Sequence, residues 1–330
     1  MALAYQNRAS AYLEPGDRQS ALADLERSLE LDDQSAAAQT QLGLGFLDLG
    51  RGEEAIIALD RAIDLVPEFF PTYGNRGIAY SKTGEIQLAM ADYGKAIELN
   101  PTYSLAYRNR GSAYVLRGEL ELAIADLDRT IELEPGNSTE YISRGVVRAA
   151  SGNLTLAVDD YTVAIMADPT SLNAYLNRGS TYDRLGRYAG AVIDYGNALH
   201  LAPDSPTLYT NRWASFHAQD DLQRALVDFK KAVSLDPTSA PAWYNLGVVH
   251  EDLGDLGKAV ENYGQAIILQ TDNIDSLINR ALVYSKLGEH ASVIEDTDRV
   301  VEIDPTYAKA YLVRASVHAK LGLPPVPGRP

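Results

Sequence analysis

The segments FPTYGNRGIAYSKTGEIQLAMADYGKAIELNPTY (70–103) and SLAYRNRGSAYVLRGELELAIADLDRTIELEPGN (104–137) follow one another directly and share one pattern. The same 34-residue pattern occurs nine times without insertion or deletion, from Ala2 to Tyr307. The copies are residues 2–35, 36–69, 70–103, 104–137, 138–171, 172–205, 206–239, 240–273 and 274–307. A fixed period of this length indicates stacked supersecondary units, so we expect one elongated array rather than domains with separate cores.

Helical spacing recurs inside every copy. Position 4 is usually aromatic, position 8 small and position 11 aromatic, which places an apolar stripe on a first helix, called helix A. Position 15 is glycine in eight of the nine copies, from Gly16 to Gly288, where a helix ends in a left-handed residue. Alanine at position 20, a large side chain at position 24 and proline at position 32 are typical of a second helix, helix B. The predicted fold class is therefore all-α.

These positions resemble the tetratricopeptide repeat, whose pattern combines aromatic-x2-Leu-Gly-x2-Tyr with Ala-x3-Phe and a closing Pro. The resemblance implies antiparallel helix pairs stacked into a right-handed α-solenoid, a superhelix whose A helices line a concave groove. Residues 308–321 match helix A of a tenth copy and would form a C-terminal capping helix. We therefore expect a single solenoid over residues 1–323 and a proline-rich tail over residues 324–330.

Composition limits the class of partner. The formal net charge is −16 and the chain has no cysteine. Negative charge opposes binding to nucleic acid and to anionic membrane surfaces. No apolar run approaches the roughly 18 residues that a membrane helix needs, so membrane insertion is not expected. The first residues do not form a basic segment followed by an apolar stretch, so nothing indicates secretion and we expect a cytoplasmic protein.

Arginine replaces the leucine that the family usually has at position 7, and aspartate recurs at position 23. The two residues occur in the same seven copies, as Arg8 with Asp24, Arg76 with Asp92, Arg110 with Asp126, Arg144 with Asp160, Arg178 with Asp194, Arg212 with Asp228, and Arg280 with Asp296. The two copies that carry Leu42 and Leu246 instead of arginine also lack the aspartate. We predict a bidentate bridge between helices A and B of one repeat. Coincidental inheritance by duplication is the alternative.

Asparagine recurs at position 6, which faces the groove in this family. Seven copies carry it, as Asn7, Asn75, Asn109, Asn177, Asn211, Asn245 and Asn279. Asparagine costs roughly 0.5 kcal/mol in a helix interior relative to alanine, so helix formation does not explain it. A side-chain amide offers a peptide bond both a donor and an acceptor, which predicts contact with a bound backbone. The ladder resembles that of the O-linked N-acetylglucosamine transferase family. The alternative is a relic of duplication that bonds to neighbouring helices or to arginine.

Residues beside the ladder would decide selectivity. Apolar residues midway along the groove predict a patch that either seats an apolar side chain or packs neighbouring A helices; they are Val115, Leu116, Ile142, Val146, Ala149 and Ala150. A mixed-charge stretch follows, made of Asp183, Arg184, His217, Tyr244, Glu251, Asp252 and Lys286. Arg108 is a further candidate peptide-binding residue. It stands alone at position 5, so we do not expect the clamp by which some family members grip a C-terminal carboxylate.

No residue pattern indicates catalysis, because the histidines lack metal-ligand spacing and neither a phosphate-binding loop nor a Ser/His/Asp arrangement is visible. We expect a protein that is not an enzyme and uses no cofactor. In the seventh copy, Trp213 replaces the small residue and Asp220 the turn glycine, which predicts that its two helices splay locally, as a bend or a contact site. Gly94, Gly196 and Gly264 lie inside helix B, where the sequence offers no reason for them.

The sequence therefore favours a protein–protein interaction scaffold that binds extended peptide or protein segments in the concave groove. One alternative is a substrate-recognition arm of a larger enzyme, such as a glycosyltransferase or a signalling protein, of which this chain is a fragment. Another is self-association through the ends of the array.

Overall fold

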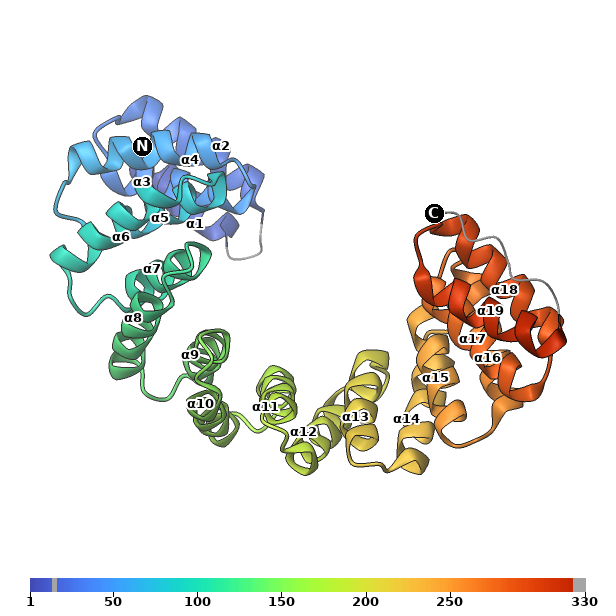
Figure 1. The fold of residues 1–330 in the computed structure, drawn as a ribbon. Coiled ribbons are helices and arrows are strands. Elements are labelled where there is room, and N and C mark those ends of the chain that lie inside the picture. The colour runs from blue at the N-terminus through green and yellow to red at the C-terminus, as the bar shows by residue number, and fades with distance from the viewer. Residues whose placement is uncertain (14–16, 323–330) are drawn as a thin grey trace. The chain divides into compact units, whose positions relative to one another are not determined.

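A computed structural model describes residues 1–13 and 17–322. In these ranges the chain forms nineteen α-helices, and no described residue lies in a β-strand (Figure 1). The helices are α1 (Ala2–Leu13), α2 (Arg18–Leu31), α3 (Ala36–Asp48), α4 (Gly52–Leu65), α5 (Phe70–Thr83), α6 (Ile86–Leu99), α7 (Ser104–Leu116), α8 (Leu120–Leu133), α9 (Ser138–Ala150), α10 (Leu154–Ala167), α11 (Leu172–Arg184), α12 (Tyr188–Leu201), α13 (Pro206–Ala218), α14 (Leu222–Leu235), α15 (Ala240–Asp252), α16 (Leu256–Leu269), α17 (Ile274–Leu287), α18 (His290–Ile303) and α19 (Ala308–Leu321). The predicted all-α fold is confirmed. The expected tail over residues 324–330 lies outside the described residues.

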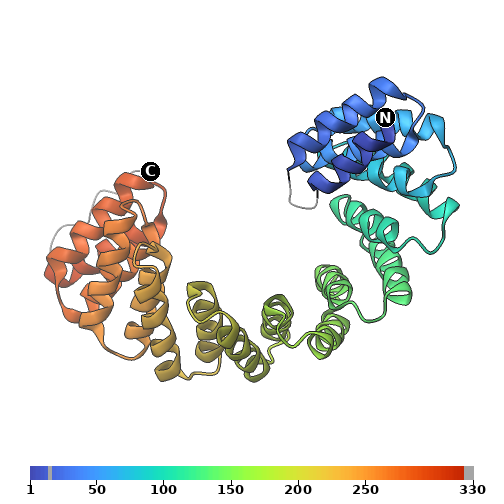
Figure 2. The same cartoon turned by 180° about the vertical axis from the view of Figure 1, so that it is seen from behind.

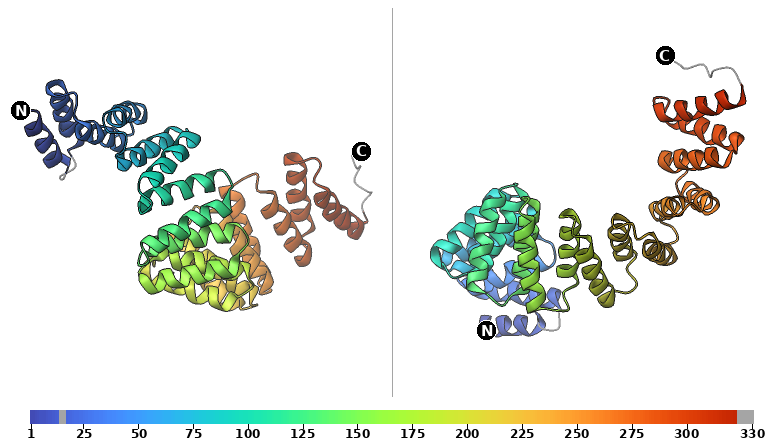
Figure 3. Two further views of the ribbon diagram at one scale, coloured as in Figure 1. Left: turned by 90° about the vertical axis from the view of Figure 1, so that its left-hand side faces the viewer. Right: turned by 60° about the horizontal axis from the view of Figure 1, so that its bottom comes forward.

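Each odd-numbered helix from α1 to α17 is the A helix of a repeat and packs against the even-numbered B helix that follows it (Figures 1 and 2). Contacts divide the chain into two units, Met1–Pro169 with α1 to α10 and Thr170–Pro330 with α11 to α19. Inside each unit, the B helix of one repeat also packs on the A helix of the next, as α4 does on α5 and α12 on α13 (Figure 3). Helix α19 has the register of an A helix and packs on α18.

Glycine at position 15 ends the A helices as predicted. Its φ is positive at every described copy, between +70° at Gly186 and +89° at Gly84. Gly16 lies outside the described residues. In the seventh repeat Asp220 takes this position with a φ of +58°, which is strained for a residue other than glycine.

Small residues let the two helices of a repeat approach closely. The alanines at position 20 are fully buried. At position 8, a Cβ atom on Gly77 would lie 2.5 Å from Cε1 of Tyr93, the residue at position 24. Glycine at position 8 is therefore required wherever a tyrosine ring from helix B lies flat against helix A.

The predicted splaying of the seventh helix pair is wrong, because α13 and α14 remain packed together. The ring of Trp213 packs on that of Phe229, with centroids 4.3 Å apart. The two rings therefore share the space that glycine and tyrosine fill in other repeats.

The predicted Arg–Asp bridge is confirmed in all seven repeats. In each, Nε and Nη2 of the arginine donate to the aspartate of the same repeat, at 2.5 to 3.2 Å. The aspartate side chains are at most 10% exposed. These bridges therefore join helix A to helix B through a buried carboxylate and an arginine that is partly exposed, most of all Arg8 at 56%.

The third nitrogen of the arginine lies beside position 25 of the preceding repeat. Nη1 of Arg76 donates to Asp60, at position 25 of the preceding repeat, at 2.6 Å. Where that position is glycine instead, as at Gly94, Gly196 and Gly264, a Cβ atom would lie 3.5 to 3.9 Å from Nη1 of the next arginine, which is an ordinary van der Waals contact. The sequence carries this signal: position 25 is Asp, Gly or Thr before each arginine, but Glu26 or Lys230 before each leucine at position 7.

Candidate functional site

The asparagines at position 6 lie on the A helices of both units, half-buried except for the exposed Asn7. Among the described residues, one side-chain hydrogen bond involves this set, from Nδ2 of Asn279 to the Tyr244 hydroxyl at 3.0 Å. Nδ2 of Asn109 is buried without a partner. The duplication-relic alternative requires bonds to helices or to arginine, and the described structure provides such a bond only at Asn279.

Asn211 lines a hollow of about 200 Å³ between α13 and α15. Thr210 and Asp236 lie beside it, and Ala242 at position 3 forms the wall on α15. This places one ladder amide at an open site between neighbouring A helices.

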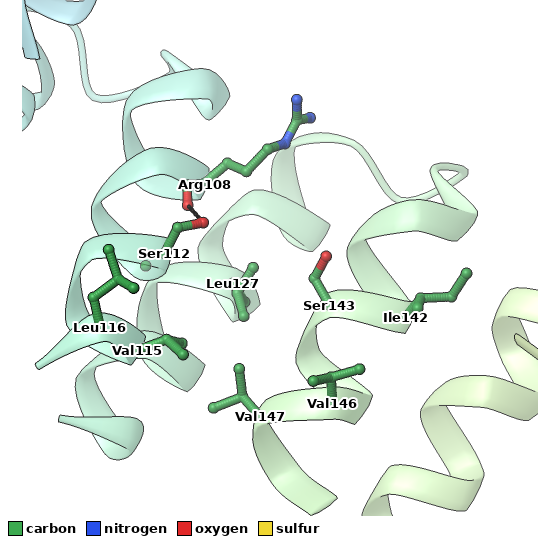
Figure 4. A pocket seen from close by; sticks show the side chains of 10 residues that line it. Arg108, Ser112, Val115, Leu116, Leu127, Ile142, Ser143, Val146 and Val147 are labelled. Carbon is green, nitrogen blue, oxygen red and sulfur yellow. Dashed lines mark hydrogen bonds between the residues drawn. The ribbon is translucent and has the colours of Figure 1, made fainter. Parts of the chain in front are cut away.

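A larger pocket of about 450 Å³ lies between α7 and α9 (Figure 4). Three predicted site residues, Arg108, Ile142 and Val146, line it. The other lining residues are Gly111, Ser112, Val115, Leu116, Leu127, Ser143 and Val147. Leu116 is 70% exposed and Val146 46%, so the rim of the pocket is apolar and open to solvent. Of the predicted apolar patch, Ala149 lies elsewhere, because it is buried against Tyr161.

Arg108 is held by two glutamates rather than free. Its Nε lies 2.6 Å from Oε1 of Glu140, and its Nη2 donates to Glu134 at 3.2 Å. Glu140 is fully buried, and that burial raises the pKa of its carboxyl, with Arg108 acting in the opposite direction. Hydrogen bonds from Ser104 and Asn137 lower the pKa of Glu134.

Glu140 was missing from the predicted site. It occupies position 3, where the other repeats have alanine, threonine, serine or leucine. The sequence feature that could have identified Glu140 is a glutamate at a position where the other repeats have small or apolar residues. Ala242 has the same position in the eighth repeat, where it forms one wall of the hollow beside Asn211.

The mixed-charge stretch in the second unit is largely paired within the protein. The Glu251 carboxylate accepts from Lys286 at 2.7 Å, and His217 contacts Asp252 at 2.8 Å. Tyr244 accepts from Asn279, and its ring lies 5.7 Å from that of Tyr263. The three polar contacts join neighbouring A helices, so this stretch presents less unpaired charge than its sequence suggests.

Two further properties concern the described ranges alone. Among residues 1–13 and 17–322, no group of three or more His, Cys, Asp or Glu side chains is placed to hold a metal ion. No helix in these ranges has the length and apolar character needed to cross a membrane.

Comparison with known proteins agrees with the repeat pattern. Tetratricopeptide repeat models match residues 7–68, 70–103, 93–125, 142–206 and 240–273, and a TPR repeat model matches residues 214–254. No curated protein matches the chain.

Several solved structures are similar. The C-terminal part of a TPR repeat-containing protein from Cytophaga hutchinsonii aligns with a TM-score of 0.65 and 18% identity, over 72% of this chain and 97% of that one. A tetratricopeptide repeat protein from Parabacteroides merdae aligns with a TM-score of 0.55 and 24% identity, over 76% and 96%. MamA aligns with a TM-score of 0.46 and 27% identity, over 49% and 94%. The first two likenesses concern the fold alone. Together with the family models and the helix pairs, they show that this chain belongs to the tetratricopeptide repeat family.

Proposed function

We propose that this protein is a non-enzymatic scaffold that binds extended peptide or protein segments along the face formed by its A helices. The observation that carries the proposal is the unused hydrogen-bonding capacity of the asparagines at position 6. Among the described residues, the side-chain amides of Asn75, Asn177, Asn211 and Asn245 make no hydrogen bond for which the structure gives a partner. Each amide has a donor and an acceptor, the pair of groups that a peptide bond requires.

Spacing supports the same binding mode. Packed helices lie about 8–10 Å apart. An extended peptide advances about 3.3 Å per residue. Successive asparagines would therefore meet every third peptide unit, which lets one segment contact several repeats of a unit without distortion.

The cytoplasmic location expected from the sequence belongs to this proposal, as does the expectation that the chain uses no cofactor. The role that we propose for Arg108 is more limited than direct contact with a peptide. Because Glu134 and Glu140 already hold its guanidinium, Arg108 is better suited to shaping the α7–α9 pocket than to binding a free carboxylate.

The test measures binding of the full chain to an array of random twelve-residue peptides. Two double variants, Asn75→Ala with Asn109→Ala and Asn211→Ala with Asn245→Ala, each remove two of the amides from one unit. Alanine favours helix formation, so circular dichroism should show unchanged helicity. Loss of two amide contacts, each bond worth about 1 kcal/mol, should weaken the bound peptides at least about tenfold.

Asn197→Ala is the matched control, because Asn197 is a half-buried asparagine on the B helix α12. The control should bind the same peptides as the intact chain. Equal peptide affinities for the intact chain and both double variants would refute the proposal.

A further inference from the structure

The α7–α9 pocket occupies a place that a side chain of the protein fills in other repeats. In four repeats, position 24 of helix B is a tyrosine with its ring fully buried: Tyr93, Tyr161, Tyr195 and Tyr263. A Cβ atom on the glycine at position 8 would lie 2.5 to 3.0 Å from the ring, as at Gly77 and Gly179. The ring thus fills the space between helix A and helix B of the same repeat.

The fourth repeat lacks this ring. Position 24 is Leu127, and a Cβ atom on Gly111 would meet no atom closer than 3.5 Å. The surroundings of Tyr263 in the eighth repeat are Tyr244, Gly247 and Glu251, at positions 5, 8 and 12. The same three positions of the fourth repeat are Arg108, Gly111 and Val115, all of which line the pocket. The pocket therefore includes the place that a tyrosine ring occupies in the eighth repeat, and it opens toward the A helices.

The lining lacks the carboxylate that two of the tyrosine hydroxyls use. In the sixth and eighth repeats the hydroxyl donates to a carboxylate at position 12, to Asp183 at 2.8 Å and to Glu251 at 2.9 Å, whereas position 12 is Ser81 beside Tyr93 and Ala149 beside Tyr161. In the fourth repeat position 12 is Val115, and the neighbouring walls are Ile142, Val146 and Val147. A hydroxyl buried among these four aliphatic side chains would lose its hydrogen bonds to water and find no acceptor on them.

Polar groups border the pocket on one side. Figure 4 shows Ser112 and Ser143 above the aliphatic side chains of Val115, Val146 and Val147. The two serine hydroxyls donate to backbone carbonyls of their own helices, Ser112 to Arg108 at 3.1 Å and Ser143 to Thr139 at 2.9 Å. With their protons used, both oxygens remain as acceptors for the N–H groups of a bound backbone.

From this geometry we propose that the pocket between α7 and α9 binds the side chain of a phenylalanine carried by an extended peptide segment. The ring enters from the A-helix side and takes the place that a tyrosine ring takes from helix B in other repeats. Its backbone lies across Ser112 and Ser143. The volume of about 450 Å³ is within the range of roughly 300–1,000 Å³ found for ligand pockets. This inference rests on the proposed peptide binding and adds the residue that the groove selects.

The test uses the full chain with labelled Ile, Leu and Val methyl groups, and peptides of sequence acetyl-SGSGXGSGS-amide with phenylalanine, tyrosine or alanine at X. The phenylalanine peptide should shift the NMR signals of Val115, Ile142 and Val146 in a saturable way. It should bind at least about tenfold tighter than the tyrosine peptide, because a buried hydroxyl without a partner is costly. The alanine peptide should leave these methyl signals in place.

Two variants close the pocket. Leu127→Phe fills it from α8, as Phe229 does at the same position of the seventh repeat, and should weaken the phenylalanine peptide at least about tenfold. Leu127→Met keeps a flexible side chain of similar volume there and is the control, expected to bind as the intact chain does. If Leu127→Phe fails to fold, Val146→Asp at the rim replaces it. Its control is Val163→Asp on α10, since Val163 is 39% exposed and lies outside the pocket lining.

The outcomes separate the two proposals. Phenylalanine-specific shifts that a closing variant abolishes support the pocket. Equal binding by intact and closed chains overturns it, and so does a phenylalanine peptide that leaves the pocket methyls unshifted. If all peptides shift the side-chain amide signals of Asn75 and Asn109 regardless of X, groove binding stands and the pocket inference fails. If no peptide shifts either set, both proposals fail.

Discussion

Replacement of Arg212 by leucine should destabilise the seventh repeat far more than replacement of the whole Arg212–Asp228 pair. Nε and Nη2 of Arg212 donate to Asp228 at 2.8 and 2.6 Å. The side chain of Asp228 is 3% exposed and that of Arg212 is 23% exposed. Arg212→Leu therefore leaves a buried carboxylate without its cation.

The magnitude follows from burial. Breaking a buried pair by removing one partner costs about 3–5 kcal/mol, and the partial exposure of Arg212 places this pair near the lower end, about 3 kcal/mol. The second repeat carries Leu42 and Ala58 at the same two positions, so the double variant Arg212→Leu with Asp228→Ala has a precedent within the chain. Replacing a buried pair by apolar residues is often neutral, and we expect the double variant to lie within about 1 kcal/mol of the intact protein.

Amide hydrogen exchange measured by mass spectrometry is the assay, because repeats open locally and a global midpoint would dilute the effect. In the single variant, amides of α14 should exchange about 100-fold faster, which corresponds to about 3 kcal/mol. Amides of α18, in the same unit but two repeats away, serve as the internal control. Exchange in α14 that is equally fast in the single and double variants would refute the buried-charge explanation.

Three further predictions follow from the glycines, the glutamates and the turn. Gly111→Ala should stabilise the protein by about 0.5–1 kcal/mol, because the added Cβ atom meets no atom closer than 3.5 Å. Gly77→Ala should destabilise it by about 1–3 kcal/mol, because the added Cβ atom would lie 2.5 Å from the ring of Tyr93. Urea unfolding gives the free energy of unfolding of both variants. The raised pKa of Glu140 means that its contribution is complete at low pH and is lost as pH rises through the folded-state pKa. The stability of the intact protein relative to Glu140→Gln should therefore fall as pH rises from 4 to 7. Relative to Glu134→Gln, whose carboxyl has a lowered pKa, stability should rise with pH up to about 5 and then level off, so thermal midpoints should be compared from about pH 3 to pH 7. Asp220→Gly should raise the thermal midpoint through a gain of about 1 kcal/mol, since φ is +58° there, and an unchanged midpoint would contradict strain at this turn.

Most of the fold could be predicted from the sequence because the residues that determine each helix pair lie within one repeat. Glycine at position 15, alanine at position 20 and the residues at positions 8 and 24 act within 34 residues, and their recurrence identifies them. The Arg–Asp bridge was predictable for the same reason, as two positions change together in the same repeats. The restriction of position 25 to Asp, Gly or Thr was equally readable, but only by comparing each repeat with the arginine of the next one.

The splaying predicted at Trp213 failed because one position was considered without its partner. A large ring at position 8 is incompatible with a tyrosine lying flat at position 24. Phe229 is tilted instead, and the ring planes meet at 49°. The combined volume of the two residues, rather than the size of either, decides whether the helices separate.

The sequence by itself determined the repeat, the helices, the bridges and the register of the asparagines, because these depend on contacts within one repeat or between adjacent ones. Only the tertiary structure decided which gaps between packed helices remain unfilled. Leu59 and Leu127 are the same residue at the same position, yet a Cβ atom on Gly43 would lie 2.6 Å from Leu59, while the corresponding atom on Gly111 meets no atom closer than 3.5 Å and a pocket lies beside it. Identical side chains fill a gap or leave it open according to how closely the surrounding helices and side chains pack. That packing is settled jointly by residues on α7, α8 and α9 and cannot be read from any single position.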